Sequence, residues 1–454
     1  MRRYTQLRLE ERMRIAELWQ AKFSITEIAK ALGRSPSTIF RELRRNQAPP
    51  GQYWPDTAHN LAFKRKQRTC LLDRNKELQV YTLLKHLLPE YNFVTFDQNQ
   101  DMYNARSDPD LFLSNFPSPL ILDEIQFIPE LLPAIKRHVD LSNASGQYIL
   151  TGSQNLIMMK HVTESLAGRV GILELFPLTY FELCHQTSWL EAYTESRMEC
   201  IQPSQHPQPL AELIWRGGLP GLFRKDNDIV TDYHLSYVRT YVERDVRLSE
   251  NIQNMGDFDR FTRLTASLTG QEINQTQLGR DIGITHTTAQ RWLNILKQNY
   301  QWMEVDPYWG NITKRLSRKS KGYCVDSGLA CTLQGIGSPR ALMSHPSLGA
   351  LFETYCVNMI VSWLSSYRRS AHVYHWRTSN QAEVDLVIDL DGILYPIEIK
   401  CKSHVSNRDA SGLRAFLATY AHQRVAPAII LYAGNEVMKI DANIWAIPFH
   451  SMSR

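Results

Sequence analysis

Apolar residues recur at helical spacing along the first part of the chain. Residues 9–20 and 25–32 carry them every three or four positions, which predicts two short helices. Ser24, followed three residues later by Glu27, predicts a capping box at the start of the second helix. On the first helix we expect Met13, Ile15, Leu18 and Trp19 to lie near one helical face.

A third helix is predicted from Ser35 to about Arg45. Gly33 ends the preceding helix because glycine tolerates the left-handed turn of a helix end, and Ser35 and Pro36 open the next one. Two helices joined by a glycine turn are typical of a helix-turn-helix, whose second helix contacts base edges and phosphates. The alternative is an ordinary helical hairpin with a solvated basic face. The residues expected to contact DNA are Ser35, Ser37, Thr38, Arg41, Arg44 and Arg45.

From residue 82 onward the pattern changes to short apolar runs that alternate with helical stretches. Such alternation predicts parallel βαβ units. Strands are predicted at residues 91–96, 119–124 and 147–153, and helices at 82–88, 128–141 and 156–166.

The middle predicted strand ends in two acids, Asp123 and Glu124. Phosphate hydrolysis uses such a pair, because the first acid can hold Mg²⁺ through water and the second can polarise the attacking water. Ser153, at the tip of the next strand, can sense a terminal phosphate, and Arg169 can neutralise charge in the transition state.

The stretch after a Pro- and Gln-rich linker at residues 201–209 is helical again, with a long amphipathic helix expected over 233–248. A helix pair around Gly283, at 274–282 and 285–298, is followed by predicted strands at 302–307 and 312–317. We interpret this order as a winged helix-turn-helix. The alternative is a packing module that only joins the neighbouring domains. The wing would be basic through Lys314, Arg315, Arg318, Lys319 and Lys321.

Residues 382–403 predict two strands that meet at a turn formed by Asp391 and Gly392. Strand alternation lets Asp385, Glu398 and Lys400 converge. Asp385 and Glu398 are the expected metal ligands, because two carboxylates can hold Mg²⁺ while a lysine orients the water that attacks a phosphodiester. The alternative is a structural hairpin whose charges face solvent.

Composition and charge narrow the function classes. At roughly 150 residues per domain, 454 residues suggest about three domains. No apolar run reaches membrane-spanning length, and no secretory signal is evident, so we expect a cytoplasmic protein that does not contact a membrane. The seven scattered cysteines suit a reducing compartment. Residues 1–68 carry a net charge of +9 within a chain of +5, which leaves −4 for the rest. Nucleic-acid contact should therefore begin at this basic head.

The sequence of the head, YTQLRLEERMRIAELWQAKFSITEIAKALGRSPSTIFRELRRN, resembles the DNA-binding segment of insertion-sequence transposases of the thirty family. The following GQYWPDTAHNLAFKRKQR resembles their linker, and the match ends at residue 68. Those enzymes cut DNA with three carboxylates on a ribonuclease-H-like domain, and no later part of this chain resembles that domain. The resemblance therefore implies binding to double-stranded DNA and does not imply transposition.

The segments PLILDEIQFIPELLPAIKRHVD, QYILTGSQNLIMMKHVTESLAGRVGILELFPLTYFEL and GGLPGLF resemble AAA+ ATPases with a C-terminal domain of unknown function. This resemblance spans about residues 82–440 and implies Mg²⁺ and ATP as cofactors. That family carries a phosphate loop ending in Gly-Lys-Thr just before residue 82. Residues 73–81 here contain no glycine, and no Gly-Lys pair occurs in the chain. Because that loop supplies most of the phosphate contacts, we expect ATP binding to be lost or very weak.

The strand pair resembles the core of the restriction-endonuclease-like superfamily, in which Glu353 on the preceding helix matches a further acid. We thus predict a multi-domain α/β protein that binds DNA on an AAA+ scaffold impaired in ATP binding. The alternatives are a metal-dependent nuclease acting through the C-terminal domain and a non-functional transposase–ATPase fusion; whether the chain forms a homo-oligomer stays open. The predicted domains are a helix-turn-helix at 1–68, an incomplete P-loop-type parallel αβα domain at 80–200, a helical and winged-helix region at 210–335 and a restriction-endonuclease-like α/β domain at 340–454.

Overall fold

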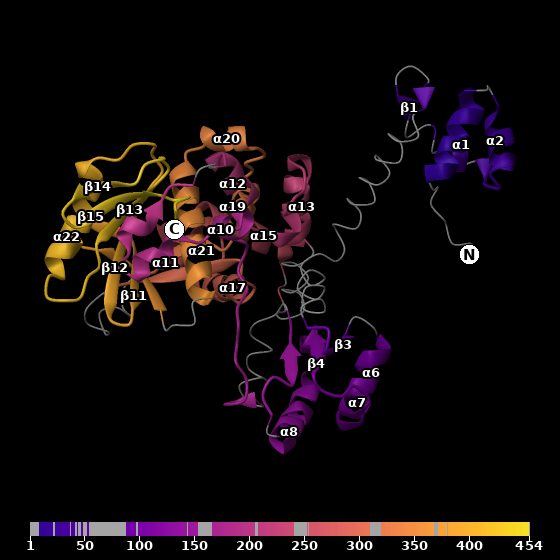
Figure 1. Cartoon of the computed structure of the whole chain (residues 1–454), viewed down its shortest axis with the longest axis horizontal. Helices are drawn as coiled ribbons and strands as arrows, with labels where there is room; N and C mark the ends of the chain where they lie inside the picture. The colour runs from indigo at the N-terminus through magenta and orange to yellow at the C-terminus, as the bar shows by residue number, and fades with distance from the viewer. Residues whose placement is uncertain are drawn as a thin grey trace. The chain divides into compact units, whose positions relative to one another are not determined.

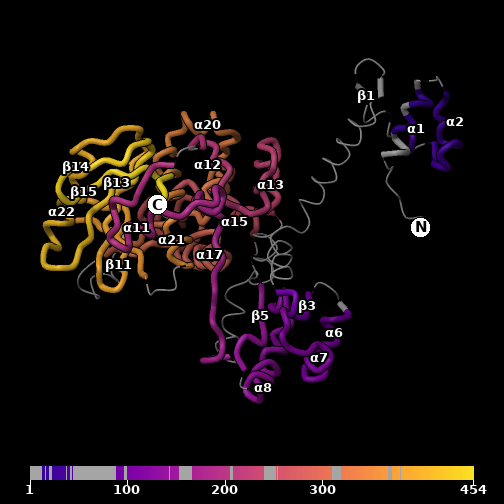
Figure 2. The backbone as a smooth tube through the Cα atoms, viewed as in Figure 1, coloured from indigo at the N-terminus to yellow at the C-terminus, as the bar shows by residue number. Residues whose placement is uncertain are grey.

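A computed structural model gives the fold of the chain (Figures 1 and 2). The chain forms two compact units, Met1–Asn75 and Lys76–Arg454. The structure describes residues 9–20, 23–36, 38–40, 43, 47–48, 52–53, 88–96, 99–142, 144–152, 166–204, 208–239, 252, 254–308, 319–366, 371–378 and 380–453.

The N-terminal unit contains the predicted helices α1 (Leu9–Gln20) and α2 (Ile25–Ala31), followed by helical residues at 36, 38–40 and 43. The Ser24–Glu27 capping box is confirmed, and Gly33 has φ +61°. Strands β1 (Gln47–Ala48) and β2 (Gln52–Tyr53) pair antiparallel. The core consists of Ile15, Ile28, Ala29, Ile39 and Leu43, with Leu18, Trp19, Ile25 and Leu32 packed against it.

One residue of the predicted face of α1 is not buried. Met13 is 50% exposed, whereas Ile15 is fully buried. Positions two apart on an α-helix differ by about 200°, so these two side chains point to nearly opposite sides. The prediction for Met13 was therefore wrong.

The second unit begins with the predicted parallel sheet. Its strands are β3 (Asn92–Thr95), β4 (Leu120–Asp123) and β5 (Tyr148–Leu150), and β4 lies between the other two with parallel pairing on both sides. Buried apolar side chains from the strands and helices make one core. The accompanying helices are α6 (Asn99–Ser107), α7 (Pro109–Asn115) and α8 (Leu132–Ser142), with short 3-10 turns at Ile125–Phe127 and Pro129–Leu131. Sequence analysis did not predict α6 and α7.

A helical region follows and contains the predicted helix pair. Helices α16 (Gln275–Ile282) and α17 (His286–Gln298) flank Gly283, which has φ +83°. Of the long helix expected over 233–248, the described part is α13 (Val230–Tyr237) and the two residues after it. The other helices here are α10 (Tyr180–Cys184), α11 (Trp189–Thr194), α12 (Leu210–Arg216), α15 (Met255–Ser267), α19 (Ser327–Leu333) and α20 (Pro339–Met343), with 3-10 turns at Met198–Cys200, Pro220–Leu222 and Asn227–Ile229.

Within the described residues, the C-terminal sheet has nine strands in the order β14-β15-β13-β12-β11-β10-β8-β9-β7. Helices α21 (Leu348–Ser366) and α22 (Ser411–Thr419) pack on β12. Figure 1 labels α22 beside the yellow strands. A separate two-stranded sheet pairs β6 (Ile201–Gln202) with β16 (Met452–Ser453). The nine strands are β7 (Gln271–Glu272), β8 (Trp302–Pro307), β9 (Lys321–Cys324), β10 (Ala371–Arg377), β11 (Glu383–Leu390), β12 (Ile393–Lys400), β13 (Ala428–Tyr432), β14 (Met438–Asp441) and β15 (Ile444–Pro448).

This sheet joins two regions that the sequence analysis kept apart. Strand β8 has the bounds predicted for the first wing strand, and it pairs antiparallel with β9 and parallel with β10. The second wing strand predicted at 312–317 lies outside the described residues. The sheet therefore runs across the boundary expected between residues 335 and 340. The predicted hairpin between β11 and β12 is confirmed, with Asp391 at φ +53° and Gly392 at φ +75°.

Candidate functional site

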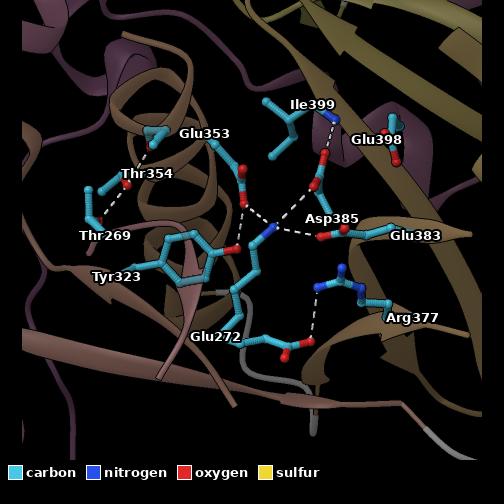
Figure 3. Close-up of polar contacts among 12 residues, drawn as sticks. Thr269, Glu272, Tyr323, Glu353, Thr354, Arg377, Glu383, Asp385, Glu398 and Ile399 are labelled. Atoms are coloured by element: carbon cyan, nitrogen blue, oxygen red, sulfur yellow. Dashed lines mark hydrogen bonds and ion pairs between the residues drawn. The ribbon is translucent and has the colours of Figure 1, made fainter. Parts of the chain in front are cut away.

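A cluster of acidic and basic side chains lies where β9, α21 and β11 meet (Figure 3). The ammonium nitrogen of Lys321 is 2.7 Å from Glu353 Oε1, 3.2 Å from Glu383 Oε1 and 3.2 Å from Asp385 Oδ1. The lysine side chain is only 6% exposed and that of Asp385 only 8%. A buried lysine thus stands at the centre of three carboxylates within the described part of the chain.

The second half of this cluster contains the motif residues of β12. The Lys400 ammonium forms an ion pair with Glu398 and lies 3.8 Å from Asp385 Oδ2. The same Asp385 oxygen accepts a 2.8 Å hydrogen bond from the Ile399 backbone N–H. Asp385 therefore lies between two lysines and is the central acid of the cluster. The predicted convergence of Asp385, Glu398 and Lys400 is present in the structure.

Hydrogen bonds fix α21 to β9 and thereby position Glu353. The Tyr323 hydroxyl donates to Glu353 Oε1 at 2.7 Å, and Tyr323 is fully buried. The hydroxyls of Thr269 and Thr354 are 2.7 Å apart, and Thr269 also accepts from the Cys324 backbone N–H. Glu353 approaches the cluster from its helix, as predicted. The sequence motif contained neither Tyr323 nor Thr269.

Burial and neighbouring charge divide the acids into two kinds. Burial, and then the charge of Asp385, raise the pKa of Glu353 to about 7 and that of Glu398 to about 8. Burial alone would raise the pKa of Asp385, but the two lysines hold it below its usual value. Burial works against the charged form of Lys321, yet Asp385 and the other acids hold its pKa well above the usual range. The ionised core of the cluster is therefore Lys321 with Asp385.

The cluster does not fit Mg²⁺ as it is arranged. Mg²⁺ binds oxygen ligands at about 2.0–2.1 Å in an octahedron. Here Glu353, Glu383 and Asp385 surround an ammonium at 2.7–3.2 Å instead. Within the described ranges, no group of three or more His, Cys, Asp or Glu side chains is spaced to hold a metal ion. Asp385 and Glu398, predicted as metal ligands, have lysines as their charged partners.

The acids at the end of β4 have different neighbours. Asp123 and Glu124 are 7% and 3% exposed, and Glu124 has φ +58°. The Thr151 hydroxyl donates to Asp123, and the Gln126 amide donates to Glu124. Thr151 follows β5, whose carboxyl end lies beside that of β4 because the two strands are parallel. The sequence analysis missed both donors.

Arg169 and Ser153 were also expected beside Asp123 at the carboxyl edge of the parallel sheet. Arg169 forms an ion pair with Asp140 near the end of α8. In a parallel βαβ unit the helix returns toward the amino ends of the strands, so this pair lies at the edge opposite Asp123. The structure therefore does not bring Arg169 to Asp123. Ser153 lies outside the described residues.

In the helix-turn-helix, two of the predicted DNA contacts serve as a helix cap. The Thr38 backbone N–H donates to the Ser35 hydroxyl at 3.3 Å, and the two hydroxyls are 2.8 Å apart. Ser35 is exposed and Thr38 half-buried. The remaining predicted contacts lie outside the described residues: Ser37, Arg41, Arg44 and Arg45.

The helix pair α16 and α17 repeats this cap, because Thr285 accepts from the Thr288 N–H at 3.1 Å. Thr287, Gln290 and Arg291 are exposed on α17. The expected basic wing needs a correction at Lys321, which is buried among acids and does not face solvent. Lys319 is exposed, and the other expected wing residues lie outside the described residues: Lys314, Arg315 and Arg318.

Comparison with known proteins defines the class. Residues 3–46 match a helix-turn-helix domain and residues 76–184 an AAA domain. Residues 207–340 match a domain of unknown function (DUF8612), and residues 348–452 match another (DUF4143). The molecule is thus a multi-domain α/β protein that joins a helix-turn-helix to an AAA-family domain, as the two resemblances implied.

Comparison with a similar protein identifies the family of the chain. It is 30% identical over 358 residues to the uncharacterized protein Rv2008c of Mycobacterium tuberculosis (strain ATCC 25618 / H37Rv), which covers 78% of this chain and 74% of that protein. This chain belongs to the same family.

The head has separate relatives. It is 54% identical over 52 residues to the transposase for insertion sequence element IS1086 of Cupriavidus metallidurans, which is 11% of this chain and 15% of that protein. The chain is 43% identical over 81 residues to the transposase InsI for insertion sequence element IS30A of Escherichia coli (strain K12), a match that covers 17% of this chain and 21% of that protein. No helix in the described residues is long and apolar enough to cross a membrane.

Proposed function

We propose that this protein is a cytoplasmic DNA-binding protein that contacts double-stranded DNA through its N-terminal helix-turn-helix. The observation that carries the proposal is the head itself: its first residues match a helix-turn-helix domain and transposases, and they fold around their own core. The net charge of +9 over residues 1–68 supplies the attraction for phosphates.

In this proposal the arginines of the third helix contact different parts of the DNA, because of their positions along the helix. Arg41 can form paired hydrogen bonds with a base edge, whereas Arg44 and Arg45, further along the helix, suit phosphates. Because Ser35 and Thr38 cap the helix, their hydroxyls position its N-terminus. In this proposal they contribute less to base recognition than Arg41.

The test is the affinity of the full chain for a labelled duplex, followed by fluorescence anisotropy. We expect affinity to fall by roughly 10³ or more from 50 to 200 mM salt if about six phosphates are contacted. Arg45→Ala should weaken binding to all sequences alike, and Arg41→Ala should mainly relax sequence preference. Arg340→Ala, an exposed residue of α20, is the matched control and should leave affinity unchanged. An affinity that barely responds to salt would contradict the proposal.

The AAA-family body, in this proposal, binds ATP weakly if at all. Asp123 and Glu124 are present at the end of β4, where the family would use them with Mg²⁺. The glycine-rich loop and its lysine, which provide most phosphate contacts, have no counterpart in residues 73–81. The acids alone do not make a nucleotide site. We expect no saturable Mg·ATP binding below millimolar concentration in calorimetry, and a micromolar constant would refute this part.

The exposed face of α17 supports a second contact with DNA from the region proposed as a winged helix. Thr287, Gln290 and Arg291 all lie on that face. Arg291→Ala should then reduce DNA affinity by a factor smaller than Arg45→Ala does, because it removes one contact of a secondary surface. Unchanged affinity would favour the alternative, in which this region only joins its neighbours.

One observation favours a second candidate function, DNA cleavage by a restriction-endonuclease-like C-terminal domain: Asp385, Glu398 and Lys400 converge. Because the cluster does not fit Mg²⁺ as arranged, this function ranks below DNA binding. We expect no Mg²⁺-dependent nicking of plasmid DNA. Mg²⁺-dependent nicking that disappears in a folded Glu398→Gln variant would reverse the ranking.

A further inference from the structure

The number of N–H donors on the Lys321 ammonium equals the number of carboxylate oxygens around it. An ammonium group has three N–H donors and no acceptor. Within the described residues, Lys321 has three carboxylate oxygens at 2.7–3.2 Å, one each from Glu353, Glu383 and Asp385. All three distances lie within the range of N–H···O hydrogen bonds, and the one to Glu353 is typical of a charge-assisted bond. The donor capacity of the lysine is therefore used fully, although its side chain is only 6% exposed.

The strand that carries Lys321 is packed too tightly for the side chain to leave easily. Gly322, the next residue, lies against Trp302, because a Cβ built on this glycine would meet the Trp302 ring at 2.0 Å. Lys321, Gly322 and Tyr323 are all buried, and β9 pairs with both β8 and β7. The ammonium is thus held among the carboxylates by the sheet itself.

The lysine and the acids come from separate stretches of the chain. Lys321 lies in the region 207–340, whereas Glu353, Glu383 and Asp385 lie in the region 348–452. Lys400 already pairs with Asp385 and Glu398. The sequence motif contains one lysine, Lys400, for the position beside a divalent ion. Here a second lysine, Lys321, lies where the carboxylate oxygens converge.

We propose that Lys321 is a built-in cation that takes the place of a divalent metal ion among Glu353, Glu383 and Asp385 and closes the cluster to metals. This inference is independent of DNA binding by the head. Replacing the ammonium by an uncharged side chain leaves three carboxylates around a site without a cation. Oxygen-rich, negatively charged sites of this kind bind Mn²⁺ and Mg²⁺.

The experiment measures Mn²⁺ binding to the full chain by electron paramagnetic resonance, with Mn²⁺ alone as the probe. We expect Lys321→Met to bind one Mn²⁺ at least tenfold more tightly than the unmodified protein. Lys321→Arg keeps the charge and should not gain the site. Lys321→Met combined with Asp385→Asn should lose it again, because the central acid is gone. Equal, weak binding by Lys321→Met and the unmodified protein would overturn the proposal, and so would tight binding by the unmodified protein.

A folding defect does not leave the proposal untested. If Lys321→Met folds only with Mn²⁺, that rescue supports the proposal, provided that Lys321→Met combined with Asp385→Asn is not rescued. If Lys321→Met fails to fold under both conditions, the additional change Glu353→Gln relieves repulsion and leaves two carboxylates. A folded protein of that kind should still bind Mn²⁺ more tightly than the unmodified protein, and failure to do so would overturn the proposal. Its failure would leave the salt-dependent binding of DNA by the head unaffected.

Discussion

Two regions of the molecule hold pairs of buried acids on strands, and their surroundings differ. At the end of β4, Asp123 and Glu124 accept hydrogen bonds from a hydroxyl and an amide, Thr151 and Gln126. In the C-terminal sheet, Asp385 lies between two ammonium groups. Within the described residues, the acids at β4 accept hydrogen bonds from a hydroxyl and an amide, whereas Asp385 has two cations beside it. An acidic motif therefore acquires its chemistry from neighbours that are not part of the motif.

The largest expected effect comes from removing the acid between the two lysines. Asp385→Asn leaves Lys321 and Lys400 without their shared partner, and breaking a buried ion pair typically costs about 3–5 kcal/mol. We expect a strongly lowered midpoint of thermal unfolding in calorimetry. Asp389→Asn, on the same strand and half-buried, is the control and should change it little. Equal effects of the two changes would show that Asp385 has no special role.

A smaller effect concerns the pH dependence of stability through Glu398, whose pKa is raised whereas that of Asp385 is lowered. Its pKa of about 8 exceeds the unfolded value, so the folded state binds this proton more tightly. Its stabilising contribution is therefore present below about pH 4.5 and is lost as pH rises through about 8. Burial disfavours the charged form of Glu398 most, Asp385 and Glu383 also disfavour it, and Lys400 favours it.

Glu398→Gln removes this loss, so the variant should gain stability relative to the unmodified protein as pH rises from 5 to 9. The gain should be on the order of 1 kcal/mol or more at the upper end. The midpoint of unfolding, measured at several pH values, is the readout. Glu199→Gln, at an exposed position, should show no such trend. A Glu398→Gln variant that parallels the unmodified protein across this range would contradict the assigned pKa.

The smallest expected effect is at the carboxyl end of β4, next to Asp123. Thr151→Val keeps the shape of the side chain and removes the donor to Asp123, which costs about 1 kcal/mol for one hydrogen bond. The readout is amide hydrogen exchange of β4 and β5. We expect a modest, local loss of protection. A loss as large as that from Asp385→Asn in its own sheet would erase the contrast between the two regions.

Features encoded by short-range signals were predictable from the sequence. The capping box at Ser24, the turns at Gly33 and Gly283 and the hairpin at Asp391 each depend on residues within one turn of the chain. The strands around Asp123 were also found, since a buried strand of a parallel sheet is a short apolar run between helices.

Features that depend on distant pairing were not predictable. Strand β8 pairs with β10 through Asp306 and Tyr374, and no local pattern indicates that partner. Lys321 precedes Asp385 by 64 residues, and its basic neighbours in the sequence suggested a surface wing. Lys321 is buried among acids, whereas the sequence predicted that it lies on a basic surface. The contacts of Asp123 with Thr151 likewise depend on strand order, which the single sequence leaves open.

We propose that this protein binds DNA through its head and that nucleotide does not change this binding. The affinity of the full chain for duplex DNA is measured by anisotropy at fixed salt, with and without millimolar Mg·ATP. We expect the same affinity under both conditions, with equal salt dependence. A saturable shift of DNA affinity at micromolar ATP that Asp123→Asn abolishes would contradict it, because it would require a working nucleotide site at the end of β4.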